Sequence, residues 1–94
     1  MGKEKKLNIL VTYVKDQKTK QPRGVLVAIA ADRIGMSLCN PVDQWNSTKG
    51  RLLAAGRAAL GINFDRAFPE HGSNTYLRKE YNSFCAKAKL HFTL

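Results

Sequence analysis

VLVAIAADRIGMSLC, residues 25–39, is the stretch that decides the fold, because it holds two apolar runs separated by two charged residues. Residues 25–31 form a short, continuous apolar run, which indicates a strand buried on both of its faces. Residues 34–39 supply a second strand, and Asp32-Arg33 makes a tight turn between the two. The stretch therefore predicts an antiparallel hairpin.

Another strand precedes this hairpin. Residues 7–14, LNILVTYV, alternate so that the odd-numbered side, which ends at Tyr13, is wholly apolar and the even-numbered side is mixed. The polar segment 15–24 that follows ends in Gly24 and is typical of a long hairpin loop. Three consecutive strands joined in this way predict an antiparallel meander.

A helix is expected after the meander. Asn40 is a good N-cap, Pro41 suits the first helical position, and Asp43 adds negative charge to the first turn. Ser47-Thr48 offers a second possible start, and Gly61 is a plausible left-handed end.

Helical spacing divides this helix into two sides. The predicted apolar stripe, which should face the sheet, consists of Trp45, Leu52, Gly56, Ala59 and Leu60. The opposite side is small and polar, and we expect it to face outward with Ser47, Gly50, Ala54 and Arg57.

The last third of the chain predicts a connector, a second helix and a strand. In the connector 62–74, Ile62, Phe64 and Phe68 should close off the core, and Ser73 or Asn74 can cap the helix that follows. That helix carries a regular apolar stripe of Leu77, Tyr81, Phe84 and Ala88. The tail KLHFTL, residues 89–94, alternates like a strand at a sheet edge.

These segments predict one α+β domain over residues 1–94, with the order β-β-β-α-α-β. The expected fold is a three-stranded antiparallel meander followed by two helices and a C-terminal strand, with both helices packed on one face of the sheet. Residues 1–6 are expected to form a flexible basic N-terminus. The oligomeric state stays open, because the terminal strand can close the sheet within one chain or pair across a dimer.

Composition points to an anionic partner. The 94 residues include 16 Lys and Arg against 7 Asp and Glu, which gives a formal net charge of +9. A surplus of this size speeds association with phosphate polymers or acidic proteins. No apolar run approaches the ~18 residues of a spanning helix, and the N-terminus lacks a signal-peptide cleavage site, so we expect a cytoplasmic protein without membrane contact.

No pattern of residues indicates catalysis. His71 and His91 lie far apart in the sequence, without the Cys or carboxylate spacing of a zinc site. The spacing of Gly50 and Gly56 lacks the Gly-Lys-Ser/Thr ending of a phosphate-binding loop. We therefore expect a protein that is not an enzyme and has no catalytic residues, metal site or cofactor.

The basic residues form regions along the sequence. The candidate binding residues are those of the hairpin loop and the first helix, where cations can meet phosphates from two directions: Lys15, Lys18, Lys20, Arg23, Lys49, Gly50, Arg51 and Arg57. Other cations lie at the N-terminus and along the last helix.

A structural explanation of the same residues stays open beside the functional one. On that explanation the cations are solvated surface, Trp45 fills the core, Gly50 and Gly56 allow close packing of helix on sheet, and Arg57 pairs with Asp43 or Asp65.

The meander followed by a helix that starts with cations and continues as LLAAGRAAL resembles the second half of a double-stranded-RNA-binding domain. The resemblance implies that Lys49 and Arg51 grip phosphates while the Ala-rich part packs on the sheet. It ends with this helix, and the family's first helix has no counterpart, since the first strand begins at residue 7.

Residues 24–59, in which GVLVAIA leads through SLCNPVDQW to KGRLLAAGRA, are similar to small, basic, mostly uncharacterised bacteriophage proteins. This resemblance implies a non-enzymatic protein of the host cytoplasm that occupies a host protein or nucleic acid. Its contact surface would include the following residues: Asp43, Trp45, Lys49, Gly50, Arg51 and Arg57.

Two hypotheses follow. In the first, the protein binds duplex DNA or RNA through the phosphate backbone, without base readout, because no exposed aromatic series is evident for stacking bases. In the second, it is a phage-encoded inhibitor that binds an acidic host protein, as an anti-defence or host-takeover factor, through the same basic surface.

Overall fold

The computed structural model describes residues 9–39 and 44–93. The strands are β1 (Leu10–Lys15), β2 (Pro22–Ala30) and β3 (Arg33–Leu38). The helices are α1 (Ser47–Leu60), α2 (Phe64–Ala67) and α3 (Thr75–Thr93), with a 3-10 turn, η1 (Pro69–His71), between the last two.

The predicted meander is confirmed. The three strands lie in the order β1-β2-β3, and both neighbouring pairs are antiparallel. The register sets Leu26 of β2 opposite Thr12 on one side and Met36 on the other. β2 is thus the central strand, as its continuous apolar sequence predicts.

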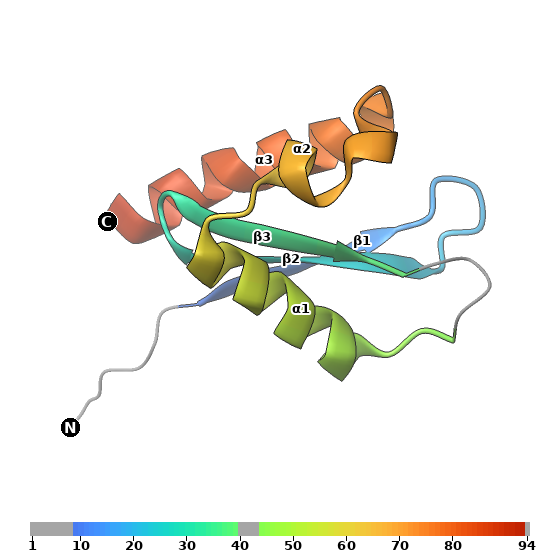
Figure 1. Cartoon of the computed structure of the whole chain (residues 1–94), viewed down its shortest axis with the longest axis horizontal. Helices are drawn as coiled ribbons and strands as arrows, with labels where there is room; N and C mark the ends of the chain where they lie inside the picture. Colours follow the sequence, from blue (N-terminus) through green and yellow to red (C-terminus); the bar gives the residue numbers. More distant parts are fainter. Residues whose placement is uncertain (1–8, 40–43, 94) are drawn as a thin grey trace.

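The prediction that both helices cover one face of the sheet is wrong. Figure 1 shows α1 on one side of the sheet and α2 and α3 on the other. β2 is buried on both faces because alternate residues of a strand point to opposite sides, and each apolar side needs its own cover. Leu26 and Ala28 belong to the core under α3, whereas Val25 and Val27 belong to a smaller core with Ala54 of α1.

α1 begins at Ser47, later than its first predicted start. Asn46 caps the helix, and its side-chain oxygen accepts a hydrogen bond from the Lys49 backbone N–H at 3.0 Å. The alternative cap around Asn40, Pro41 and Asp43 lies outside the described residues. The predicted end at Gly61 is confirmed, because this glycine adopts φ 72° and its N–H bonds back to the last turn.

The predicted orientation of α1 is also wrong. Ala54, from its small side, and Ala58 are buried against the sheet, whereas Leu52 and Leu60 from the predicted apolar stripe are 70% and 73% exposed. The reason lies at Gly35 of β3, where a Cβ atom would overlap the Ala54 carbonyl oxygen and the Ala58 nitrogen. Backbone approaches backbone so closely that only small side chains fit between them.

The other face of the sheet carries the larger core. Its members come from all three strands and from the segment after α1, and Phe64 and Phe68 of the predicted connector are buried among them as expected. Asn74 caps α3, since its side chain accepts from the Leu77 N–H at 3.1 Å. The predicted stripe of α3 is confirmed: Leu77, Phe84 and Ala88 are buried, and Tyr81 packs beside them.

The predicted C-terminal strand is wrong, because α3 continues through Thr93. Phe92 follows Ala88 by four residues and packs against the same core, so the helical period continues where the sequence also alternates. Leu90, the other apolar residue of the tail in the described range, is exposed. Within the described residues, β1 and β3 are therefore both edge strands of a three-stranded sheet.

Candidate functional site

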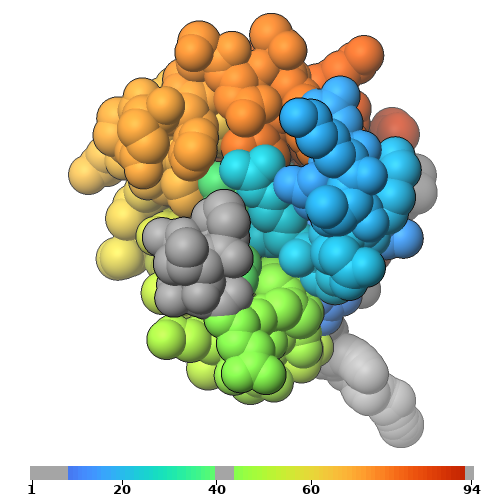
Figure 2. All heavy atoms as spheres, turned by 90° about the vertical axis from the view of Figure 1, so that its right-hand side faces the viewer, coloured from blue at the N-terminus to red at the C-terminus, as the bar shows by residue number. Residues whose placement is uncertain are grey.

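The topology brings the two predicted basic segments to one end of the molecule. A meander of three strands ends at the same end as its first turn, so α1 starts near the hairpin loop 16–21. Figure 2 views this end and shows the loop, in blue, on the same face as the first turn of α1, in green. The loop and helix cations therefore share one end, which we call the basic end and define by Lys15, Lys18, Lys20, Lys49 and Arg51.

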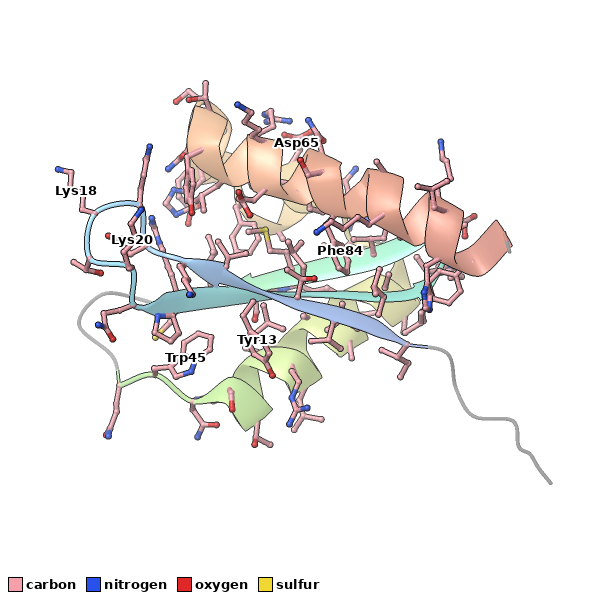
Figure 3. The ribbon with its side chains drawn as sticks, turned by 180° about the vertical axis from the view of Figure 1, so that it is seen from behind. Tyr13, Lys18, Lys20, Trp45, Asp65 and Phe84 are labelled. Carbon is pink, nitrogen blue, oxygen red and sulfur yellow. The ribbon has the colours of Figure 1, made fainter. Side chains whose placement is uncertain are left out.

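The loop is held in a turn by its own hydrogen bonds. The Asp16 carboxylate accepts from the backbone N–H groups of Lys18 at 2.9 Å and Thr19 at 3.0 Å, and these bonds, with Arg23 nearby, lower the pKa of Asp16. Lys20 adopts a left-handed conformation, with φ 64°. Lys18 and Lys20 are exposed, and Figure 3 shows both at the end of the loop.

Arg23 is set apart from the other loop cations. It is half-buried, and its guanidinium lies 3.9 Å from the Asp16 carboxylate. Part of its charge is thus balanced within the loop. Lys15, by contrast, is exposed, and its backbone carbonyl accepts a hydrogen bond from the Tyr76 hydroxyl at 2.8 Å, which ties the loop to the start of α3.

The start of α1 adds positive charge without compensation on the same helix. Lys49 and Arg51 are exposed, and neither the first turn nor the rest of α1 contains an acidic residue. The positive end of the helix dipole lies here as well. An anion approaching the basic end meets side-chain cations and the dipole together.

The expectation that Gly50 and Arg57 project outward is wrong. The Gly50 carbonyl accepts a hydrogen bond from the Ser37 hydroxyl at 2.7 Å, and a Cβ atom there would lie 3.0 Å from Val25 Cγ2. Arg57 donates to the Met36 carbonyl at 2.8 Å, and its guanidinium lies 5.1 Å from the centre of the Phe68 ring. Arg57 thus joins α1 to the edge strand β3 and to the segment after α2.

Gly56, which was expected to allow close packing, meets open space, since nothing lies within 4 Å of a Cβ atom built on it. The suggested pairing of Arg57 with Asp65 is not seen in the described part of the chain, where Asp65 pairs with Arg78 at 2.6 Å. Asp43, the other suggested partner, lies outside it.

The acidic side chains are unevenly distributed among the described elements. Asp65 in α2, Glu70 in η1 and Glu80 in α3 all belong to the elements after α1, whereas β1 and α1 contain none. The charged side chains of α1 are therefore all basic, whereas the elements after α1 carry charges of both signs.

Sequence reasoning missed an exposed aromatic residue beside the basic end. Tyr13 of β1 lies on the same side of the sheet as α1, and its ring meets the ring of Trp45 edge-on, with centroids 6.4 Å apart (Figure 3). Trp45 is half-buried and precedes α1 rather than belonging to its stripe. The signal for Tyr13 was its place on the wholly apolar side of β1, but the sequence does not say which part of that side a helix covers.

A hollow in the surface lies away from the basic end. It has a volume of about 270 Å³ and is lined in part by Tyr81 and Cys85. Burial raises the pKa of Tyr81 to about 12 and raises that of Cys85 as well. The thiol is therefore held in its protonated, less nucleophilic form at neutral pH.

Neither a metal cluster nor a membrane-spanning helix is found among the described residues. No three side chains of His, Cys, Asp or Glu gather there in an arrangement that can hold a metal ion. Nor does any helix in that part of the chain combine the length and apolar character needed to cross a bilayer.

Comparison of the chain with protein-family models found no match, and comparisons with curated proteins and with solved structures found no significant similarity. A function for the chain therefore rests on its own surface chemistry.

Proposed function

We propose that this protein binds nucleic acid without catalysis, and that the basic end makes most of the contacts, with the phosphate backbone. The observation that carries the proposal is the convergence of exposed cations from two separate elements, the hairpin loop and the start of α1, on one end of the molecule (Figure 2). Phosphates arranged along a strand need cations at several points, and two elements supply them from two directions.

The charge balance of the molecule supports the proposal. A formal net charge of +9 favours approach to a polyanion. Positive charge on the α3 side is partly compensated, as Arg78 is by Asp65, whereas Lys49 and Arg51 lie on a helix without acids. The field should therefore orient a polyanion toward the basic end.

The structural explanation accounts for part of the predicted site. Gly50 and Arg57 have packing and hydrogen-bonding roles, so we leave both out of the proposed contact surface. Lys18, Lys20, Lys49 and Arg51 are exposed, and no such role within the described residues restrains their side chains.

Fluorescence anisotropy of labelled oligonucleotides, measured at several salt concentrations, tests the proposal. The logarithm of the association constant should fall linearly with the logarithm of salt concentration, with a slope of about −0.9 per phosphate contact on duplex DNA. A protein that binds through an apolar interface would be less sensitive to salt.

The key variant removes one cation from each element, Lys18→Gln with Lys49→Gln. Binding should weaken, and for each phosphate that the variant no longer neutralises the salt slope should become shallower by about 0.9 on duplex DNA or about 0.7 on a single strand. If the charge of Lys20 is removed as well, asparagine is the suitable replacement, because it tolerates the left-handed backbone at this position.

The matched control is Arg66→Gln with Lys87→Gln, which removes the same charge from exposed positions in α2 and α3. Equally weakened binding in both double variants would show that only net charge matters and that the basic end is not the site. Absence of binding at physiological salt would reject the proposal and favour an acidic protein partner.

A further inference from the structure

We infer that the proposed nucleic-acid site takes single strands, and that Tyr13 is a stacking platform for an unpaired base. This inference rests on the proposed function and adds the class of nucleic acid to it. Tyr13 lies on the part of the sheet that α1 leaves uncovered.

α1 lies over β2 and β3, and β1 is the edge strand next to β2. On the α1 side of the sheet, Tyr13 is 44% exposed and Ile9 is 43% exposed. Ile29 of β2 is 38% exposed and directly follows Ala28, which pairs with Leu10 of β1. The outer part of this face is thus an open, apolar surface that includes one aromatic ring.

Tyr13 differs from the other two tyrosines of the chain. Tyr76 donates a hydrogen bond from its hydroxyl to the Lys15 carbonyl, and the Tyr81 ring packs against the Phe64 ring with centroids 5.6 Å apart. The Tyr13 hydroxyl has no hydrogen-bond partner among the described residues, and its ring is nearly half exposed. Neither the hydroxyl nor the outer face of the ring is used to stabilise the described part of the fold.

The ring is nevertheless held in place. It meets Trp45 edge-on, with an interplanar angle of 72°. On the strand, Tyr13 pairs with Val25, which is fully buried. An exposed ring whose position is already restrained loses little conformational freedom when a flat ligand stacks on it.

Exposed cations lie on the two elements next to this ring, β1 and α1. Lys15 is exposed and follows Tyr13 by two residues at the end of β1, where the pairing register with β2 shifts between Val14 and Lys15. Arg51 precedes Ala55 by four residues, and Ala55 packs against the small core together with Val11 of β1. Arg51 is therefore on the side of α1 that is turned toward β1.

A flat aromatic surface with cations on the elements next to it matches a single strand, in which a base is free to stack while its neighbouring phosphates meet Lys or Arg. Bases of a duplex are already stacked on one another, so Tyr13 adds nothing to duplex binding. A peptide would also need an apolar surface, but it has no use for these cations unless it is acidic. The charge of the surface thus favours a strand of nucleic acid.

Trp45 supplies the readout, because it is the single tryptophan of the chain and lies beside Tyr13. Three probes of equal length are titrated into the intact protein: a thymine single strand, an abasic deoxyribose-phosphate strand and a duplex. The expected result is that the thymine strand binds more tightly than the abasic strand and quenches Trp45 emission, whereas the abasic strand and the duplex do not quench it.

The decisive variant is Tyr13→Leu, which keeps an apolar side chain and removes the ring. It should weaken binding of the thymine strand by about tenfold and leave abasic binding unchanged, as expected for one stacked base. Tyr13→Phe keeps the ring and should bind like the unmodified protein. Leu90→Ala, which changes an exposed apolar residue of α3, is the control.

The outcomes separate the two proposals. Equal binding of thymine and abasic strands, with no effect of Tyr13→Leu but weaker binding by the Lys18 and Lys49 double variant, would overturn base stacking and leave phosphate binding standing. Absence of binding by all three probes would overturn both and leave a protein partner for this surface.

Discussion

On the α3 side of the sheet, large side chains fill the space between sheet and helix, whereas on the α1 side the space is almost closed by small ones. Phe64, Phe68 and Phe84 occupy the first core. In the second core, Ala54 of α1 packs on Val25 and Val27 of β2, and Gly35 of β3 allows the close approach of the helix.

The difference has a consequence for the surface. A helix that lies close to the sheet on alanines makes a narrow contact, so α1 covers β2 and β3 and leaves Ile9 and Tyr13 on the apolar side of β1 exposed. The aromatic core keeps the fold together, and the narrow contact leaves an exposed ring beside a cluster of cations. Substitutions on each face test this division.

The largest loss of stability is expected for Phe84→Ala. Phe84 is fully buried between α3 and the sheet, and Figure 3 shows it on the side opposite Tyr13. Truncating a buried phenylalanine costs about 3–5 kcal/mol, and urea denaturation followed by circular dichroism measures it. Leu90→Ala, on the exposed side of the same helix, should change little. Similar midpoints for the two variants would mean that this face is not the main core.

The next largest loss is expected for Gly35→Ala. The added methyl group meets the Ala54 carbonyl oxygen and the Ala58 nitrogen, which are backbone atoms of α1, so the helix must move away from β3. Overpacking of this kind costs about 1–3 kcal/mol. Thermal unfolding checks the loss, and an unchanged melting temperature would show that α1 does not pack closely on β3.

A smaller loss is expected for Arg57→Ala. The substitution removes the hydrogen bond to the Met36 carbonyl and the contact with the Phe68 ring. Together these contribute about 1–2 kcal/mol. Arg51→Ala, which removes an exposed cation from the same helix, should stay within about 0.5 kcal/mol of the unmodified protein. If both variants unfold at the same urea concentration, Arg57 does not have the structural role assigned to it.

The smallest effect, a gain, is expected for Gly56→Ala. Position 56 is in the middle of α1 and its added methyl group meets open space, so the helix should gain about 0.5–1 kcal/mol. Gly50→Ala is the matched comparison, because its methyl group lies 3.0 Å from Val25 Cγ2 and the packing cost offsets the gain. A larger gain in stability at position 50 than at position 56 would contradict the orientation assigned to α1.

The local patterns were sufficient for much of the fold. The alternation of residues 7–14 and the apolar runs of residues 25–39 predicted the meander, and Gly61 and Asn74 predicted where one helix ends and another begins. These features depend on strand period, backbone conformation and capping, which act over a few residues. The tail was ambiguous, since Phe92 fits both an alternating strand and a helical stripe, and contact with the core selected the helix.

The candidate site also had one part that the sequence could predict and one part that it could not. The connectivity of the meander makes the loop and the start of α1 neighbours, so grouping Lys18 and Lys20 with Lys49 and Arg51 was possible from the sequence. The roles of Gly50 and Arg57 were not predictable, because they depend on which side of α1 meets the sheet.

By itself the sequence determined the three strands, the end of α1, the apolar stripe of α3 and the excess of positive charge. Only the tertiary structure decided that helices cover both faces of the sheet, that α1 packs through Ala54 and Ala58, and that Tyr13 stays exposed. The physical reason is that the spacing of hydrophobic residues identifies only the side of a helix that has the largest apolar area. At Gly35 the closeness of two backbones favours the side with the smallest side chains.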